Sequence, residues 1–541
     1  MSDHLLAILP VLLPMTGLVL CLALWRAVLF QRVVMLCVAG SMLASAVAIL
    51  GRTSSGGVLA ARLGDWPSPV AITFVIDQAS AIMVLLNAIV ACAAAVYSLG
   101  GIDHRRERSA YYALLCGLFA AVSGSFVTAD LFNLYVWFEV MLMSSFVLLG
   151  LGGRRSQIEG AIKYVTLNLI SSTLFLAAIG LTYAMLGTLN MAQLGERLAA
   201  ADNPQLFTPV AAVFLVAFAI KSAAFPFFYW LPASYHTPPP VIAAVFAGLL
   251  TKVGVYVMIR FFTLLFPATH PDASLIYTII LWLAGLSMIT GVLSAAAQMN
   301  IRRILSFHII SQIGYMLMGL GIAGAVLARA AREGDAEGAL AAAGTLAMTG
   351  TIFYILHHIV VKANLFLVAG IVERLCGSGD LDKIGGLYAA RPGLSVLFLV
   401  PAFSLAGIPV LSGFWSKFVL VRAGLEAGAY WIVAVSLAVS AVTLFSMIKI
   451  WMYAFWKPAP EGAAPIGACE TGTMGSVRWQ YAGSAMLACV TVAIGLLAGR
   501  AIGLGEIGAF QVLDRAAYSD AALDRTGVRP GPTGDEGEAA P

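Results

Sequence analysis

The chain has 541 residues, of which 60% are hydrophobic and only 11% are charged. Soluble globular proteins carry about 25% charged residues, so a soluble enzyme is excluded. A membrane β-barrel is disfavoured, because barrel strands alternate apolar and polar residues whereas this chain has long apolar runs. The formal net charge of +4 is too small to indicate a nucleic-acid partner. We therefore expect an all-α polytopic membrane protein.

The seven cysteines are scattered and form no CxxC pair, which gives no support to an iron–sulfur cluster, a structural zinc or a disulfide framework. The sequence contains neither a Walker A loop nor a GxGxxG motif after a strand. We expect no bound cofactor and no metal. Energy from ATP or NADH would have to come from another subunit.

Stretches of about 20 apolar residues are long enough to cross a bilayer as a helix. We count fourteen: residues 5–25, 30–50, 79–100, 109–129, 131–151, 161–187, 208–230, 238–265, 275–298, 304–325, 341–373, 394–422, 428–456 and 481–503. The first is too long for a signal-peptide core, so we expect it to be retained. Residues 504–541 are polar, acidic and contain Pro and Gly, which predicts a disordered tail.

The distribution of basic residues predicts the topology. Loops after odd-numbered helices carry about twice as many Lys and Arg residues as loops after even-numbered helices, and positively charged loops stay in the cytoplasm. This bias places the odd loops in the cytoplasm and both termini outside, which agrees with an even number of helices. In this count we assign Arg260 to a loop that follows an even-numbered helix.

Five lysines fall inside apolar stretches. Glu139 is the acidic residue that lies in the middle of such a stretch. The lysines are Lys221, Lys252, Lys362, Lys417 and Lys449. A charge at the bilayer centre costs at least about 2.5–3.5 kcal/mol, and packing alone could use leucine instead. Some lysines could reach the membrane interface with their ammonium groups, an interpretation that fits Lys449 best because it lies late in its stretch.

Lysine is an informative choice because an ammonium group can release its proton outside water, whereas arginine stays protonated. This choice predicts a proton relay rather than a permanent binding site. His358 lies four residues before Lys362, so the two share a helix face. His357 and His308 are further candidates, since histidine titrates near neutral pH. For each histidine, a purely hydrogen-bonded role is the alternative.

Two stretches carry proline in mid-membrane, Pro226 in the seventh and Pro409 in the twelfth. Proline breaks a helix, and unpaired backbone at membrane depth is tolerated only inside protein or beside water. Each broken stretch also carries a lysine, Lys221 or Lys417. Broken helices in corresponding halves of a chain indicate a transport pathway.

Helices four to eight and nine to thirteen form two five-helix units, each with its broken helix in fourth place. Because five is an odd number, the second unit enters the membrane from the opposite side, which predicts an inverted repeat. We expect five parts: three N-terminal helices, the first repeat, the second repeat, a loop with helix fourteen, and the tail. Their bounds are 1–101, 102–270, 271–458, 459–503 and 504–541.

The motifs FEVMLMSS, AFAIKSAAFPFFYWLP, LLTKVGVY, HHIVVKANLFL and GIPVLSGFWSKF together resemble the antiporter-like subunits shared by respiratory complex I, membrane-bound hydrogenases and Mrp cation/proton antiporters. The resemblance covers about residues 60–460. Within this family, FNLYVWFEVMLMSSF, KYVTLNLISSTLF and GTLNMAQL look most like the D-type subunit of Mrp antiporters. One loop departs from the family pattern WLPDA and reads WLPAS at 230–234, which puts a role for that carboxylate in doubt.

The resemblance implies an ion pair between Glu139 and Lys221. It implies a hydrated relay that continues through Lys252, His358, Lys362 and Lys417. It also implies work inside a hetero-oligomer of membrane subunits in a bacterial-type cell membrane, exchanging external protons for internal sodium. Two alternatives remain: a proton-pumping subunit of a redox complex, and a membrane scaffold that conducts nothing. The number of buried lysines disfavours the scaffold.

Overall fold

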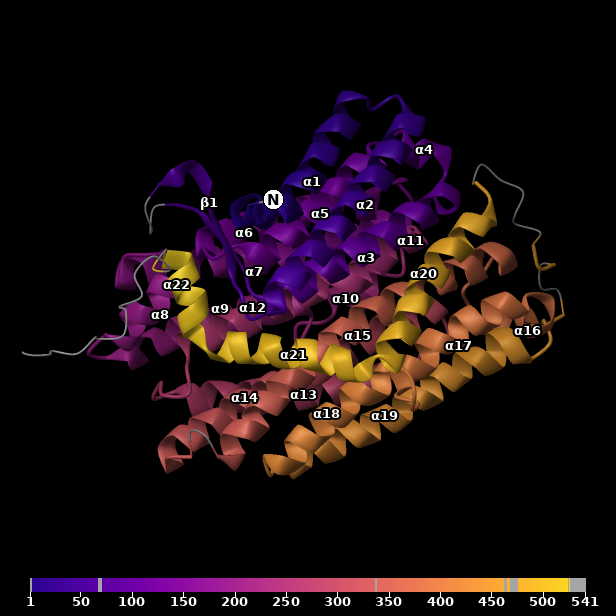
Figure 1. The fold of residues 1–541 in the computed structure, drawn as a ribbon. Coiled ribbons are helices and arrows are strands. Elements are labelled where there is room, and N and C mark those ends of the chain that lie inside the picture. Colours follow the sequence, from indigo (N-terminus) through magenta and orange to yellow (C-terminus); the bar gives the residue numbers. More distant parts are fainter. Residues whose placement is uncertain are drawn as a thin grey trace, which may run out of the picture.

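The computed structural model describes residues 2–66, 71–335, 338–461, 465–467, 475–523 and 525. These residues form a bundle of long helices with one two-stranded hairpin (Figure 1). Within this part of the chain, 12 helices are long and apolar enough to cross a membrane. The predicted class, an all-α polytopic membrane protein, is confirmed.

The N-terminal part contains three long helices and the hairpin. The helices are α1 (Asp3–Ala23), α2 (Val28–Thr53) and α3 (Gln78–Gly101). Between α2 and α3, strands β1 (Leu59–Arg62) and β2 (Thr73–Ile76) pair antiparallel, and the short η1 (Leu63–Asp65) follows β1. Asp77 then caps α3, because its carboxylate accepts a hydrogen bond from the backbone N–H of Ser80 at 2.9 Å.

The first five-helix unit follows. Its long helices are α5 (Tyr111–Val127), α6 (Leu131–Gly150), α7 (Arg155–Leu186), α9 (Thr208–Ser222) with α10 (Trp230–Ser234), and α11 (Pro240–Val245) continued by η3 (Phe246–Leu250) and α12 (Thr251–Leu265). The connections hold α4 (His104–Glu107), α8 (Met191–Ala199) and η2 (Pro204–Phe207).

The second unit repeats this order of elements. Its long helices are α13 (Ala273–Ala296), α14 (Ile301–Glu333), α15 (Ala339–Cys376), α17 (Pro392–Ala406) with α18 (Ser412–Glu426), and α19 (Tyr430–Ile450) continued by η5 (Trp451–Trp456). The connections hold η4 (Leu381–Lys383) and α16 (Leu387–Ala390).

Each of the fourteen expected stretches falls on these helices or on α20 (Val477–Leu496). Two of them, α5 and α17, are shorter than the 12 long helices. The number of membrane crossings, the inverted relation of the two units and the division into five parts stay predictions.

Both helices that the sequence predicts to be broken are interrupted. The first interruption separates α9 from α10 and begins at Ala223, and the second separates α17 from α18 and begins at Gly407. Both residues adopt the left-handed conformation, with φ of 57° and 93°, which ends a helix. Pro226 and Pro409 lie within these interruptions, as expected.

The helices that end the two units each contain a π-helical segment, η3 and η5. Such segments are rare and often lie at functional sites. Lys252 comes just after η3, whereas Lys449 comes just before η5. The two lysines therefore lie at opposite ends of their π segments, and the two units are not exact copies.

The prediction that residues 504–541 form a disordered tail is wrong for the residues up to 523. Residues up to 523 continue as α21 (Ala498–Leu513) and α22 (Arg515–Leu523). In Figure 1, α21 runs across the long helices and α22 turns toward α8, against which it packs. Gly505 and Gly508 allow α21 to lie close to α15 and α3. The overall polarity of 504–541 concealed these helices, since its apolar residues gather before 524; residues 524 and 526–541 lie outside the described part.

The packing of the connections agrees with the predicted alternation of sides. Loop order places α22, α8 and the hairpin on one side, and α22 packs against both α8 and the hairpin. On the opposite side, Arg106 donates to the carbonyl of Leu151, and Arg302 donates to the carbonyl of Pro238. Which side faces the cytoplasm stays a prediction.

Candidate functional site

Four of the five predicted lysines are buried in the bundle: Lys221, Lys252, Lys362 and Lys417. Lys449 is partly exposed. In the described part of the chain, the lysine ion pairs are those of Lys163 with Glu159 and Lys383 with Asp380, both outside this set. The buried ammonium groups are instead bound by carbonyl and hydroxyl oxygens.

Lys221 lies in the last turn of α9, directly before the first helix break. Its Nζ donates to the hydroxyl of Ser172 at 3.1 Å and to the carbonyl of Asn168 at 3.4 Å, both on α7. The ring of Phe138 on α6 lies 5.6 Å from the same Nζ, at cation–π distance. Three helices of the first unit therefore converge on this lysine.

Glu139 follows Phe138 on α6, so its helix faces Lys221, but the implied ion pair is not formed. Among the described residues, Lys221 Nζ has no carboxylate oxygen of Glu139 within 4.0 Å. Its ammonium group is instead directed toward α7, where it binds Ser172. The Glu139 Oε1 atom is buried and has no hydrogen-bond partner among these residues. A buried carboxylate oxygen without a partner is costly, so this side chain is not held in place by a hydrogen bond at Oε1.

The middle of the bundle brings Lys252, His358 and Lys362 together on α12 and α15. Lys252 donates to the carbonyl of Ala247, which belongs to the π segment η3. Lys362 donates to the carbonyl of Leu305 on α14 at 3.1 Å. His358 is fully buried, and neither ring nitrogen has a partner among the described residues. The hydrogen bonds of both ammonium groups thus go to backbone carbonyls.

A stacked aromatic ladder joins His358 to Lys417. The ring of His358 stacks on Tyr354 with centroids 6.3 Å apart, and Tyr354 stacks on Tyr315 at 5.1 Å. The Nζ of Lys417 lies 5.2 Å from the ring of Tyr315. The Tyr354 hydroxyl also donates to Gln312. Sequence reasoning did not find Tyr354; its position four residues before His358 was the available signal.

Lys417 lies on α18, directly after the second helix break. Its Nζ donates to the carbonyls of Leu405 and Ala406 at 3.0 and 3.1 Å, which are the last carbonyls of α17. The C-terminal end of a helix carries partial negative charge, so it attracts a cation without a carboxylate. The helix break therefore creates the binding site for this lysine.

His357 binds both halves of the broken helix. Its Nδ1 lies 2.9 Å from the hydroxyl of Ser412 on α18 and 3.4 Å from that of Ser404 on α17. The two hydroxyls lie 2.9 Å apart. This arrangement fits the hydrogen-bonded alternative for His357. His308 differs, because it is fully buried on α14 and neither ring nitrogen has a partner among the described residues.

Lys449 lies at the edge of the bundle. Its Nζ donates to the carbonyls of Ala296 and Gln298 at 2.7 Å each, where α13 ends. The side chain is only partly buried, which fits the interpretation of a lysine that reaches the membrane interface.

The sequence placed Arg260 in a loop, and this placement is wrong. Arg260 lies inside α12, is 4% exposed, and its Nη2 pairs with Asp77 Oδ2 at 2.6 Å. The same nitrogen donates to Tyr256 Oη at 3.2 Å. A permanent cation in this position needs a carboxylate, and Asp77 supplies it from the start of α3. The spacing of Arg260 four residues after Tyr256 was the available signal.

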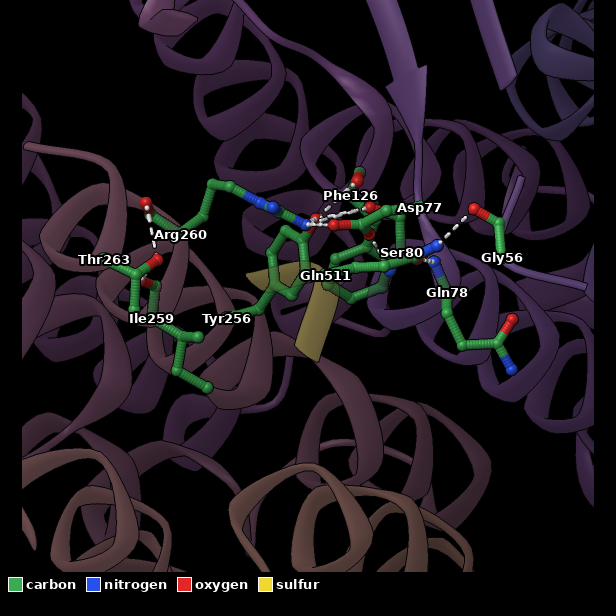
Figure 2. Close-up of polar contacts among 10 residues, drawn as sticks. All are labelled: Gly56, Asp77, Gln78, Ser80, Phe126, Tyr256, Ile259, Arg260, Thr263 and Gln511. Atoms are coloured by element: carbon green, nitrogen blue, oxygen red, sulfur yellow. Dashed lines mark hydrogen bonds and ion pairs between the residues drawn. The ribbon is translucent and has the colours of Figure 1, made fainter. Parts of the chain in front are cut away.

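The C-terminal helices contribute to the surroundings of this ion pair, and Figure 2 shows Gln511 of α21 near it. The side chain of Gln511 on α21 accepts from the N–H of Gln78 at 2.7 Å and donates to the carbonyl of Gly56 at 3.0 Å. The ring of Tyr518 on α22 lies 4.6 Å from the Arg260 guanidinium. The network therefore fastens α21 and α22 to the hairpin, α3 and α12.

A cavity of about 430 Å³ opens beside α10, between the first helix break and the surface. Glu159, Lys163 and Arg303 contribute its charged groups, and His236 and Tyr229 contribute further titratable ones. Burial, reinforced by the charge of Arg303, lowers the pKa of His236 to about 4. His236 is therefore neutral near pH 7.

Buried amines and imidazoles lie on α9, α12, α15 and α18, and both kinds of group can in chemical terms accept and release a proton. No group of three His, Cys, Asp or Glu side chains in the described residues could hold a metal ion.

Comparisons with known proteins agree with the resemblance. A family model described as NADH:quinone oxidoreductase/Mrp antiporter, TM matches residues 128–331 and 338–443. A relative from Alkalihalophilus pseudofirmus, named as the D-type subunit of a Na(+)/H(+) antiporter, is 45% identical over 400 residues, which are 74% of this chain and 76% of the relative. A Bacillus subtilis protein of the same name is 34% identical over 458 residues, covering 85% and 88%.

Solved structures show the same fold. A chain of the Mrp complex from Dietzia sp. DQ12-45-1b is 30% identical with a TM-score of 0.82, covering 96% of this chain and 99% of that chain. A chain of respiratory complex I from Thermus thermophilus has a TM-score of 0.74 at 22% identity, covering 95% and 100%, and so shares the fold. The chain therefore belongs to the NADH:quinone oxidoreductase/Mrp antiporter family of membrane proteins and, within it, to the D-type subunits of Mrp antiporters.

Proposed function

We propose that this chain is the proton-translocating subunit of a multi-subunit Na+/H+ antiporter in a bacterial cell membrane. In this proposal the subunit takes up external protons in exchange for internal sodium and catalyses no covalent reaction. The observation that carries it is the set of four buried lysines bound by neutral oxygens rather than by carboxylates. A lysine in such a setting is stable in a protein interior with or without its proton.

The relay runs from Lys221 through Lys252 to His358 and Lys362, and through the tyrosine ladder to Lys417. Glu139 acts at one end of this row. When α6 and α9 approach, the carboxylate holds the proton on Lys221, and when they separate, the proton is released toward Lys252. The unpaired Oε1 of Glu139 and the nearby Phe138 ring support this role.

Partner subunits are part of the proposal, because the chain has no motif that couples transport to ATP or NADH. The relatives named as antiporter subunits support an antiporter over a redox complex, since the complex I likeness extends to the fold alone.

The test is sodium-dependent proton exchange in inverted vesicles from an antiporter-deficient, salt-sensitive bacterium. The complete set of subunits should exchange protons for sodium, whereas the same set without this chain, or this chain alone, should not. Exchange by the set without this chain would contradict the proposed role. Exchange and salt resistance with this chain alone would contradict the dependence on partners.

A further inference from the structure

A second cavity lies on the side that the sequence predicts to face the cytoplasm, away from the lysine row. It has a volume of about 320 Å³ and is lined by four arginines, Arg106, Arg154, Arg302 and Arg374. Glu373 is the carboxylate that lines it. Asp103 pairs with Arg106, yet the cluster keeps a net positive charge.

The arginines come from four separate parts of the chain. Arg106 lies in α4, Arg154 directly precedes α7, Arg302 lies in the first turn of α14, and Arg374 lies in the last turn of α15. Loop charge alone explains why they share a side of the membrane. Loop charge does not explain why the four arginines line the same cavity. The fold brings them together.

The structure fixes three of these side chains and leaves donors free. Arg302 binds Glu373 through Nε at 2.6 Å and the Pro238 carbonyl through Nη1 at 2.6 Å, but its Nη2 has no partner among the described residues. Arg106 binds Leu151 and Asp103 and likewise keeps Nη2 free in this part of the chain. Arg154 is exposed, and its guanidinium makes no hydrogen bond among the described residues.

Two long helices also begin at this cavity. Gln157 in the first turn of α7 and Arg302 in the first turn of α14 both line it. Helix N-termini present unpaired N–H groups and partial positive charge, which favour anions. The arginines with free guanidinium donors and the first turns of both helices thus line one space of about 320 Å³.

We propose that this cavity binds a phosphate-bearing anion. Planar guanidinium groups match phosphate oxygens with paired hydrogen bonds. Basic pockets between membrane helices on the cytoplasmic side bind the headgroups of anionic lipids. A phospholipid headgroup and a soluble phosphate compound share this chemistry. An occupant would join the turn at Pro238, before α11, to α14 and α15, and so tie the first unit to the second.

The test uses the full chain purified in its assembled complex. Native mass spectrometry measures binding of phosphatidylglycerol, of diacylglycerol as the lipid without phosphate, and of inorganic phosphate and ATP as soluble probes. The test variant is Arg154→Gln, and its matched control is Arg155→Gln, the exposed neighbour that does not line the cavity.

We expect Arg154→Gln to weaken binding of a phosphate-bearing probe about tenfold, as loss of one charge-assisted contact predicts, and Arg155→Gln to leave it unchanged. If Arg154→Gln weakens the binding of phosphatidylglycerol alone, the ligand is a lipid headgroup. If the substitution weakens the binding of inorganic phosphate or ATP alone, the ligand is a soluble compound. If it weakens the binding of both the lipid and a soluble probe, the cavity recognises the phosphate group itself. The proposal would be overturned if Arg154→Gln changed the binding of none of the probes. It would also be overturned if diacylglycerol bound as well as phosphatidylglycerol.

Discussion

The buried cations of this protein fall into two regions that are built differently. Near α21 and α22, Arg260 is paired with Asp77 and bonded to Tyr256 (Figure 2). The ring of Tyr518 on α22 also lies against its guanidinium. Along the lysine row, Lys417 and its counterparts contact carbonyls, hydroxyls and rings. The permanent charge of Arg260 is thus fixed by an opposite charge, whereas the lysines are held by neutral groups. In the proposed function this difference separates a structural cation from one that releases its proton.

Asp77→Asn should have the largest effect on stability. The amide keeps the cap on α3, but Arg260 is left buried without its counter-ion, which costs about 3–5 kcal/mol. We expect a clear loss of thermal stability in detergent and a reduced level in membranes. The control is Asp3→Asn, whose carboxylate lies on the surface 3.9 Å from Arg52. Equal stability of the two variants would show that the Arg260 pair is not structural.

Lys417→Arg should stop transport while the complex still assembles. Arginine keeps the positive charge at the end of α17 but does not release a proton. Proton–sodium exchange in inverted vesicles should fall to background at matched subunit levels. Arg422→Lys, at an exposed site on the same helix, should exchange normally. Exchange by Lys417→Arg at the rate of the unchanged protein would remove Lys417 from the relay.

Arg260→Lys is the reciprocal exchange and should have a smaller effect. The lysine can still pair with Asp77 but loses the bonds of Arg260 Nη2 to Tyr256 and Ser80. We expect a stability loss of about 1 kcal/mol, as for one or two hydrogen bonds, and normal exchange. If exchange is abolished at full assembly, Arg260 takes part in transport and the contrast between the regions fails.

Lys449→Arg should have the smallest effect. The ammonium lies at the end of α13, partly exposed, where a guanidinium can reach the same carbonyls. We expect stability within about 0.5 kcal/mol and an unchanged exchange rate, as at most surface sites. A large loss of exchange would instead extend the relay to this lysine.

Much of this arrangement is predictable from single-helix patterns. Apolar length locates the long helices. Proline locates both breaks, at Pro226 and Pro409, and glycine accompanies it in the second. Residue type singles out the lysines, since an isolated base in an apolar stretch has few structural reasons to be there. These signals are local, so the sequence carries them directly.

The contacts that depend on distant segments were not predictable. The Asp77–Arg260 pair joins residues far apart in the chain, and each looked like a helix edge or a loop charge by itself. The ladder through Tyr354 and Tyr315 depends on how α14 and α15 pack. The helices α21 and α22 gain their stability from packing on other elements, which composition does not reveal.

The most direct test of the account is Lys221→Arg. This variant preserves the charge next to Ser172 and Phe138 but removes the ability to release a proton at the first step of the relay. The measurement is proton–sodium exchange in inverted vesicles, with subunit levels matched by immunoblot. The account predicts an assembled complex without exchange. Exchange at the rate of the unchanged protein would show that Lys221 is a fixed structural charge and would contradict the relay.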